Sequence, residues 1–397
     1  MGTELVPELS QRGADPTVSQ PVARLVIHGW RFIHHSYAIV AQSHALALLR
    51  RGDVDLRFVD LPFPTGVWKR SEGILDAEDE RQLSSLRPPD AGFSAAATLR
   101  YARDFSAPAT GRAFVFDTPE FRVLRPGVTR KLRATARDAD RVHMLVPSRW
   151  AGEAYLRFGI APERVHVVPH GIDPRVLHPD GRRREASRRE LGVAGGFVFL
   201  SVGAMTDNKG IDLLLRGFAR VASRHADAWL VLKGADDLYA SGDRVRRALD
   251  ALRTAERETV ASRLSYLGDR RSARDMANLL RAADCYVSPY LAEGFNMPVL
   301  EAAACGVPVI CTAGGATDDF ISPSFAWRIR STLQRARTDL GVGEVLQPDI
   351  EHLVELMAQA VADPGAAQRM GAAGALHAAR DYTWDRVTGR LVEVLFH

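Results

Sequence analysis

The sequence lacks several features, and each absence removes a class of protein. Three cysteines in 397 residues are too few, and odd in number, for a disulfide framework. No apolar run reaches the roughly 18 to 20 residues that span a bilayer, and no hydrophobic leader opens the chain. The spacing G-x-G-x-x-G is absent, so the simple dinucleotide fingerprint does not apply. We therefore expect a cytoplasmic protein whose thiols are reduced.

Lysine is also scarce, as are aromatic residues placed among basic ones. Only four of the 52 basic residues are lysines, and the excess of arginine and alanine indicates a compositional bias rather than a function for each arginine. The net charge of +4 comes without the interleaved aromatic side chains that stack nucleic-acid bases. The densest basic run, residues 181–190, is typical of a solvated helix face or a linker, and contact with an anionic lipid is the alternative. We expect no nucleic-acid partner.

The length and the alternation of elements predict two α/β domains. A chain of this length is too long for one typical domain, and 46% apolar residues are enough for two cores. Residues 1–20 are polar, with Pro and Gly, and predict a disordered arm. Short apolar strands alternate with amphipathic helices from residue 23 onward. The alternation restarts at residue 196 after a Pro-, Arg- and Gly-rich segment, 175–195, which reads as a linker. Such alternation predicts parallel, doubly wound, Rossmann-like sheets with a cleft between the two halves.

Some stretches give weaker signals. Ser36 is the expected N-cap of the first helix. Residues 62–95 read as irregular around one charged helix, and residues 322–348 read as an irregular insertion. The strand 113–121 ends in polar residues at Asp117, which could bond a sugar hydroxyl or cap the following turn.

Histidines gather near the start of the chain, where the first strand ends at Gly29. His34 and His35 lie just beyond it, with His28 and His44 on either side. Their spacing matches no common metal-ligand pattern, so we expect no metal there. Gly29, His34 and His35 are instead candidates for contact with a substrate in the cleft.

Residues 284–315 carry the clearest chemical pattern. A buried strand is followed by a loop, a helix with Pro298 in its first turn, and a second buried strand. This arrangement brings free N–H groups and a positive helix end to the carboxyl edge of a parallel sheet, which is a ready anion site. Glu293 and Glu301 flank it. Each has a plain alternative, because a loop glutamate is usually solvated and a first-turn glutamate gains roughly 0.3–1 kcal/mol from the helix dipole.

Together these residues resemble a known signature. Glu293-Gly-Phe-Asn-Met-Pro-Val-Leu-Glu301, followed by Gly-Val-Pro-Val, is similar to the E-x7-E motif of retaining GT-B glycosyltransferases, especially the family-4 group that uses nucleotide sugars. The stretch PSRWAGEAYLRFGI with VHVVPHGID resembles the end of the N-terminal domain in that family, and the last residues resemble its returning helix. The resemblance implies an acceptor domain, 21–174 plus 383–397, and a nucleotide-sugar domain, 196–382.

The resemblance also assigns roles to individual residues. Glu301 would accept hydrogen bonds from the ribose, and Glu293 would lie at the donor sugar. The N–H groups of Phe295, Asn296 and Met297 would hold the sugar or phosphate. Relatives usually have Gly where Asn296 stands, and Asn is the next best residue where φ is positive.

Transfer from a nucleotide diphosphate needs cations for the departing phosphate. Lys209, after Gly203, and Lys233 follow consecutive strands, at the edge where α/β sheets bind ligands. The family usually carries an arginine before this lysine, and the arginine is missing here, so Lys233 or Arg31 could replace it. A histidine beside the donor sugar is also missing, and Asp117 stands in its region.

These observations predict a cytoplasmic, metal-independent, retaining glycosyltransferase of the hexosyltransferase type, with no cofactor. Its partners would be a nucleotide sugar and a small-molecule, glycan or lipid-linked acceptor, with possible peripheral membrane contact. The expected catalytic residues are Glu293, Lys209 and Asp117. Two alternatives stay open: a sugar-nucleotide epimerase or hydrolase on the same fold, for which Asp117, Glu120 and His28 could supply groups, and an inactive nucleotide-sugar-binding partner protein.

Overall fold

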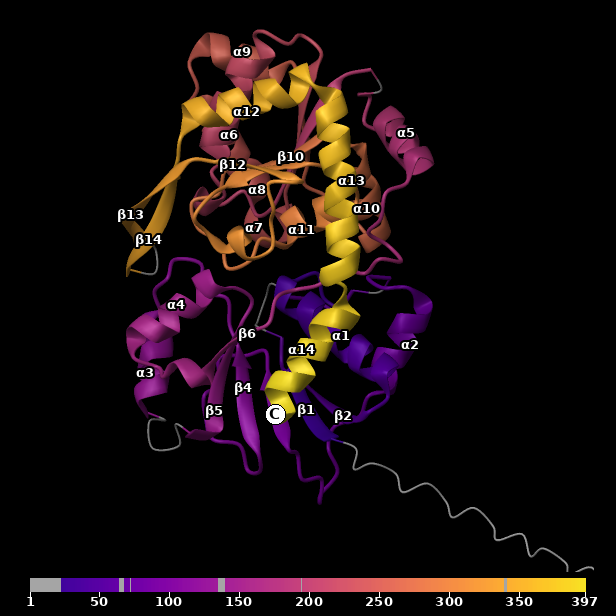
Figure 1. The fold of residues 1–397 in the computed structure, drawn as a ribbon, viewed down its shortest axis with the longest axis vertical. Helices are drawn as coiled ribbons and strands as arrows, with labels where there is room; N and C mark the ends of the chain where they lie inside the picture. The colour runs from indigo at the N-terminus through magenta and orange to yellow at the C-terminus, as the bar shows by residue number, and fades with distance from the viewer. Residues whose placement is uncertain (1–22, 64–67, 72, 135–139, 194, 339–340) are drawn as a thin grey trace, which may run out of the picture.

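The chain forms two α/β domains stacked along the long axis of the molecule (Figure 1). Each domain is built on a six-stranded sheet, with strand order β2-β1-β3-β4-β5-β6 in the N-terminal domain and β12-β11-β10-β7-β8-β9 in the C-terminal domain. All neighbouring strands in both sheets are parallel, which confirms the predicted fold class. The computed structural model describes residues 23–63, 68–71, 73–134, 140–193, 195–338 and 341–397. The predicted arm, 1–20, lies outside them.

The N-terminal domain follows the predicted strand and helix order, with two differences. Strand β3 was not predicted, because its four residues are all buried and give no alternation. The N-cap of α1 is His35, not Ser36: the His35 Nδ1 accepts a hydrogen bond from the N–H of Tyr37 at 3.3 Å. The elements are β1 (Ala23–Gly29), α1 (Ser36–Arg51), β2 (Val54–Asp60), α2 (Ala77–Ser85), β3 (Ala97–Arg100), β4 (Arg112–Phe116), α3 (Pro126–Ala134), β5 (Val142–Val146), α4 (Arg149–Phe158) and β6 (Val165–Val167).

The C-terminal domain contains more regular structure than we expected. Residues 322–348 are not irregular: they hold a sheet strand and an antiparallel hairpin, β13–β14. The elements are β7 (Phe197–Val202), α6 (Ile211–Ala222), β8 (Ala228–Lys233), α7 (Asp236–Tyr239), α8 (Ser241–Asp250), α9 (Thr254–Ala261), β9 (Leu264–Leu267), α10 (Ala273–Ala282), β10 (Cys285–Ser288), α11 (Met297–Ala304), β11 (Val309–Thr312), β12 (Ala326–Ile329), β13 (Ser331–Thr338), β14 (Gly341–Pro348), α12 (Ile350–Ala362) and α13 (Pro364–Asp381).

The segment predicted to be a linker contains helix α5 (Gly181–Glu190), which is fixed to the C-terminal domain. Arg188 lies 2.7 Å from Asp284, and Arg184 pairs with the same carboxylate. These arginines also donate to backbone carbonyls at the end of α10. Arg184 and Arg188 therefore serve packing, while Arg182, Arg183 and Arg189 are exposed, as expected of a solvated helix face.

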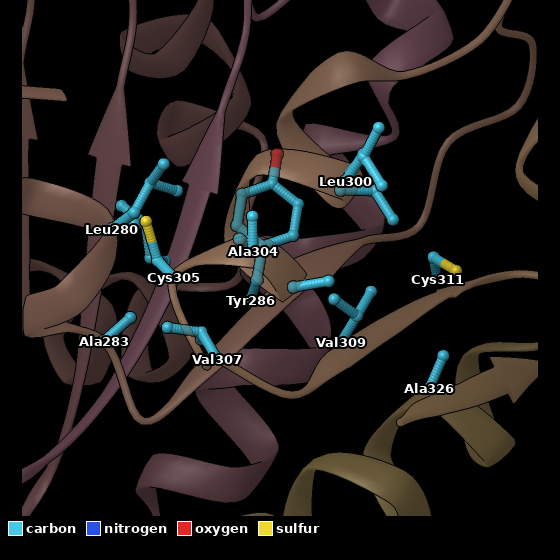
Figure 2. Packing of buried hydrophobic residues seen from close by; sticks show 14 of the residues in the cluster. Leu280, Ala283, Tyr286, Leu300, Ala304, Cys305, Val307, Val309, Cys311 and Ala326 are labelled. Carbon is cyan, nitrogen blue, oxygen red and sulfur yellow. The ribbon is translucent and has the colours of Figure 1, made fainter. Parts of the chain in front are cut away.

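The core of the C-terminal domain lies between its sheet and the helices around it (Figure 2). Tyr286, Leu300 and Val309 pack there with two of the cysteines. All three cysteines are free and buried, as predicted. Burial raises the pKa of Cys305 and of Cys311 to about 12, so both remain neutral thiols.

The last helix, α14 (Trp384–Phe396), packs in the core of the N-terminal domain. Trp384 and Leu391 lie in the same cluster as strand β1, and the Trp384 N–H donates to Ile172 at 3.1 Å. The chain thus crosses between the domains a second time (Figure 1). In the part of the chain that the structure describes, no helix combines the length and apolar character needed to cross a membrane.

Candidate active site

A cavity of about 840 Å³ opens where the two domains face each other. The C-terminal domain contributes the loops after β7, β8 and β9, and the N-terminal domain contributes the loops after β1 and β4. Parallel strands place all of their carboxyl ends at one edge, so loops far apart in sequence meet here. Among the predicted residues, the lining includes His34, His35, Asp117, Gly203, Lys209 and Lys233.

An ion pair between Lys209 and Glu293 lies at this edge. The Lys209 ammonium donates to the Glu293 Oε1, and Glu293 is only 5% exposed. Burial alone would lower the pKa of Lys209, but the carboxylates of Glu293 and Glu120 raise it above its ordinary value. The lysine is therefore charged and already held beside acids. A phosphate would have to compete with Glu293 for it.

Gly210 explains why a glycine follows Lys209. Its φ is +68°, and a Cβ at this position would lie 2.1 Å from the carbonyl oxygen of Pro289. Only glycine combines this backbone conformation with so close an approach. The turn then carries Lys209 back toward the end of β7, where a Cβ on Gly203 would meet its side chain at 3.7 Å.

More cations line the cavity than the sequence indicated. Lys233 is buried at the end of β8, where burial lowers its pKa and its ammonium donates to the Gly234 carbonyl. Arg270 and Arg271 follow β9 and also line the cavity. Their position directly after a strand was the signal that could have identified them.

Arg31 does not take the place of the missing arginine. Its guanidinium pairs with Asp60 and donates to the Leu83 carbonyl, and it is not among the residues that line the cavity. The interpretation that Arg31 compensates is therefore wrong. Arg270 and Arg271 do line the cavity, where Arg270 pairs with Asp237 and Arg271 with Asp269.

The loop and helix after β10 form the second part of the site: Leu291 lines the cavity, and Glu293, Phe295, Asn296, Met297 and Glu301 lie outside its lining. Asn296 has φ +72°, which confirms the expectation of a left-handed residue where relatives carry Gly. Its side chain donates to Ser288 Oγ at 2.9 Å. Among the described residues, none accepts a hydrogen bond from the N–H of Phe295, Asn296 or Met297. These N–H groups at the start of α11 are therefore available to an anion.

Glu301 lies on α11 with part of its side chain exposed. No other residue in the described ranges pairs with its carboxylate, and burial raises its pKa to about 7. On the neighbouring strand β10, the Tyr286 hydroxyl donates to the Val202 carbonyl at the end of β7, at 3.2 Å. An unpaired carboxylate at this edge is suited to accept hydrogen bonds from a diol.

Asp117 connects three side chains on the N-terminal side of the cavity. Its carboxylate accepts hydrogen bonds from Tyr37 at 3.0 Å, from Arg103 at 2.8 Å and from Tyr155 at 2.7 Å. It is 2% exposed. A sugar hydroxyl would have to displace one of these donors, so this geometry favours a positioning role for Asp117 over direct catalysis.

The other N-terminal candidates divide into two groups. His34 and His35 line the cavity, and burial lowers the pKa of His35 to about 4, so it is neutral at pH 7. Gly29 is buried outside the cavity lining, where a Cβ would contact Ala41 at 3.3 Å, so packing accounts for it. Glu120, absent from our expected site residues of a transferase, lines the cavity from this side.

The loop that carries Glu293 also closes the domains against each other. Ser148 Oγ donates to the Gly294 carbonyl at 2.7 Å, and a Cβ on Gly294 would lie 3.0 Å from the Cβ of Thr118. The glycine after Glu293 is thus required by the approach of the N-terminal domain.

The comparisons with known proteins agree with this geometry. The family described as "Glycosyl transferases group 1" matches residues 196–328. A GDP-mannose-dependent monoacylated alpha-(1-6)-phosphatidylinositol monomannoside mannosyltransferase from Corynebacterium glutamicum is 26% identical over 351 residues, covering 85% of this chain and 82% of that protein. A D-inositol 3-phosphate glycosyltransferase from Catenulispora acidiphila is 29% identical over 248 residues, which are 60% of this chain and 52% of that protein.

Solved structures give the fold. Sucrose-phosphate synthase from Thermosynechococcus elongatus superposes with a TM-score of 0.66 at 16% identity, covering 94% of this chain and 99% of that one. The Anabaena protein HepE in complex with UDP-glucose gives a TM-score of 0.66 at 15% identity, with the same coverage. The fold is therefore GT-B. The match over residues 196–328 and the relatives named above identify the chain as a glycosyltransferase whose C-terminal domain is similar to the group 1 enzymes.

The buried His170, behind the site, should make the free energy of unfolding depend on pH. It packs edge-on against Phe295 with 4.7 Å between ring centroids, and its Nδ1 has no partner among the described residues. Burial lowers its pKa to about 3. Because the unfolded histidine titrates near 6.5, the unfolded state binds more protons between pH 6.5 and 3, so stability falls as the pH falls through this window. At pH 5 the loss from this side chain is about 2 kcal/mol.

We therefore expect His170→Gln to lose less stability than the wild type between pH 7 and pH 5. Urea unfolding at the two pH values measures the difference. The exposed His397→Gln is the control and should behave as the wild type does. Equal losses in the wild type and in His170→Gln would contradict the burial of a neutral imidazole.

Proposed function

We propose that this enzyme is a retaining glycosyltransferase that moves a hexose from a nucleotide diphosphate sugar to an acceptor bound by the N-terminal domain. The observation that carries the proposal is the Lys209–Glu293 pair at the cavity edge, with Lys233, Arg270 and Arg271 on the neighbouring strand ends. Cations fixed at the place where the diphosphate departs stabilise the charge that grows on it.

The same cations support metal independence. Among the described residues, no group of three or more His, Cys, Asp or Glu side chains is placed to hold a metal ion. Two lysines and two arginines, with the free N–H groups at α11, offer the positive charge that a divalent ion supplies in other transferases.

The relatives suggest which substrates to test. The Corynebacterium relative is named as GDP-mannose-dependent, and HepE binds UDP-glucose. GDP-mannose is therefore the first donor to examine and UDP-glucose the second. The named acceptors include a lipid and an inositol phosphate. We infer an acceptor of one of these kinds, a cytoplasmic enzyme, and contact with a membrane surface if the acceptor is lipid-linked.

The positions of the acidic side chains support retention of the anomeric configuration of the transferred sugar. Inversion needs a base across the sugar from the leaving group. Glu293 and Glu120 both flank Lys209, the cation expected at the phosphates, so neither is placed for that role. Asp117 is occupied by three donors. The departing phosphate oxygen is then the proton acceptor, and attack occurs on the face that it leaves.

A donor screen tests the proposal. Thermal unfolding would be measured with GDP-mannose, UDP-glucose and their free diphosphates, with and without EDTA. A ligand at 100 Kd adds about 2.7 kcal/mol of stability. We expect either the GDP or the UDP series to stabilise the protein, and the enzyme to transfer the sugar of that series. The stabilisation and the turnover rate should each be the same with and without EDTA. A strict requirement for a divalent ion would refute the metal-free phosphate site, and turnover without net transfer would favour an epimerase or hydrolase.

A further inference from the structure

Glu120 brings a second carboxylate to Lys209, from the opposite domain. It follows β4 and lines the cavity, and the Asn208 side chain donates to its Oε2 at 3.3 Å. The carboxylates of Glu120 and Glu293 both raise the pKa of the Lys209 ammonium. One acid from each domain therefore flanks the cation at which the diphosphate is expected.

The backbone around Glu120 is held from both domains. Within the N-terminal domain, Trp150 Nε1 donates to the Glu120 carbonyl at 2.7 Å. From the C-terminal domain, the N–H of Glu344 on β14 donates to the Phe121 carbonyl at 2.9 Å. Figure 1 shows the β13–β14 hairpin reaching from its domain toward α4.

Arg122, the residue after Phe121, also contacts the β13–β14 hairpin. Arg122 has a φ of +53°, which is unusual for a residue with a side chain. Its guanidinium lies 3.1 Å from Glu344 and 3.2 Å from Glu153. Non-glycine residues adopt such conformations mainly where surrounding contacts impose them, often at functional sites. The hairpin thus fixes Glu120 in the closed arrangement of the domains.

We propose that Glu120 is a further catalytic residue, whose carboxylate faces the transferred sugar and stabilises the positive charge that develops on its ring. The proposal rests on the proposed function. In the step, the acceptor oxygen bonds to the anomeric carbon as the carbon–phosphate oxygen bond breaks, and the electron pair leaves with the nucleotide diphosphate. The acceptor proton passes to a departing phosphate oxygen, and Glu120 remains ionised throughout. A fixed carboxylate beside developing positive charge acts by electrostatic preorganisation.

The surroundings of Glu120 give the proposal a pH signature. Burial raises the pKa of Glu120, and the nearby carboxylate of Glu293 raises it too. The positive charges of Lys209, Arg125 and Arg103 act in the opposite direction and lower it. The net direction is upward. As the pH falls, Glu120 takes up a proton before an exposed glutamate would, so turnover should fall on the acid side.

The test compares Glu120→Gln with the wild type on the donor that the screen identifies, with GDP-mannose first. We expect turnover to fall roughly 30-fold, Kd for the free diphosphate to stay within threefold, and the acid limb of the kcat profile to disappear. Glu120→Asp keeps the charge and should recover part of the activity. Glu163→Gln is the matched control, because it removes an exposed acid of the same domain that lies outside the cavity, and it should stay within twofold.

The outcomes separate this proposal from the function on which it rests. Near-normal turnover in Glu120→Gln would overturn the role of Glu120 and leave the glycosyltransferase intact. Loss of diphosphate binding, or of the cooperative thermal transition, would show that Glu120 acts on the fold or the nucleotide and would also overturn it. A wild type that turns over no nucleotide sugar would refute the proposed function, and this role would fall with it.

Discussion

Lys209→Ala is expected to lower kcat by about 10²- to 10³-fold, while the affinity for the nucleotide sugar changes much less. The reason is that charge on the diphosphate peaks as the bond to the sugar breaks, so a cation at the phosphates acts most strongly in the transition state. Lys209 is held by Glu293. Part of its attraction for the bound donor is therefore offset by the loss of that pair.

Steady-state and single-turnover kinetics with the identified donor measure this effect. Lys209→Ala leaves the buried Glu293 carboxylate unpaired, which could destabilise the fold. The double variant Lys209→Ala/Glu293→Gln removes both charges, and its stability shows whether loss of folding contributes to the fall in kcat. The exposed Lys69→Ala is the surface control. A change confined to KM would instead make Lys209 a uniform binding residue and would shift the catalytic role to Lys233 or the arginines after β9.

Glu301→Ala is expected to weaken binding of the free nucleotide diphosphate by roughly 1.5–3 kcal/mol, because the ribose loses a charged acceptor. This corresponds to about a ten- to 150-fold rise in Kd. Among the described residues, none forms an ion pair or hydrogen bond with the Glu301 carboxylate, so little else in the fold depends on its charge. Calorimetry with GDP and UDP measures the change, and the exposed Glu355→Ala on α12 is the control. Unchanged affinity in Glu301→Ala would refute the ribose assignment.

The raised pKa of Glu301 adds a test by pH. With a pKa of about 7 in the free protein, the carboxyl carries a proton below neutral pH and must lose it to accept two hydroxyl donors. Affinity should therefore rise with pH up to about 7 and level off above it, by up to about tenfold per unit on the acid side. Glu301→Gln should abolish this dependence.

The residues 284–315 show what a sequence can predict unaided. Strand, loop, helix and strand lie where apolar runs, Pro298 and Gly306 indicate, because those signals are local. Asn296 has the positive φ at which Asn is the next best residue after the Gly that relatives carry there. Lys209 was identified because lysines are rare and two of them follow strands.

What escaped prediction depends on partners distant in sequence. Arg184 and Arg188 of α5 look like part of the solvated run until Asp284 is placed beside them. Strand β3 is four residues long, and the β13–β14 hairpin is stabilised by contact with Phe121 and Arg122 in the other domain. Glu120 follows a strand without any motif, and only closure of the domains brings it to Lys209.

The anomeric configuration of the first product tests the central claim most directly. Proton NMR during the first turnovers reads the coupling at the anomeric carbon before any later exchange. We predict that an α-linked nucleotide sugar gives an α-linked product, since the proton acceptor is the departing phosphate oxygen. A β-linked product would contradict retention, and would require a base across the sugar from Lys209, for which His34, His35 and Asp117 are the candidates.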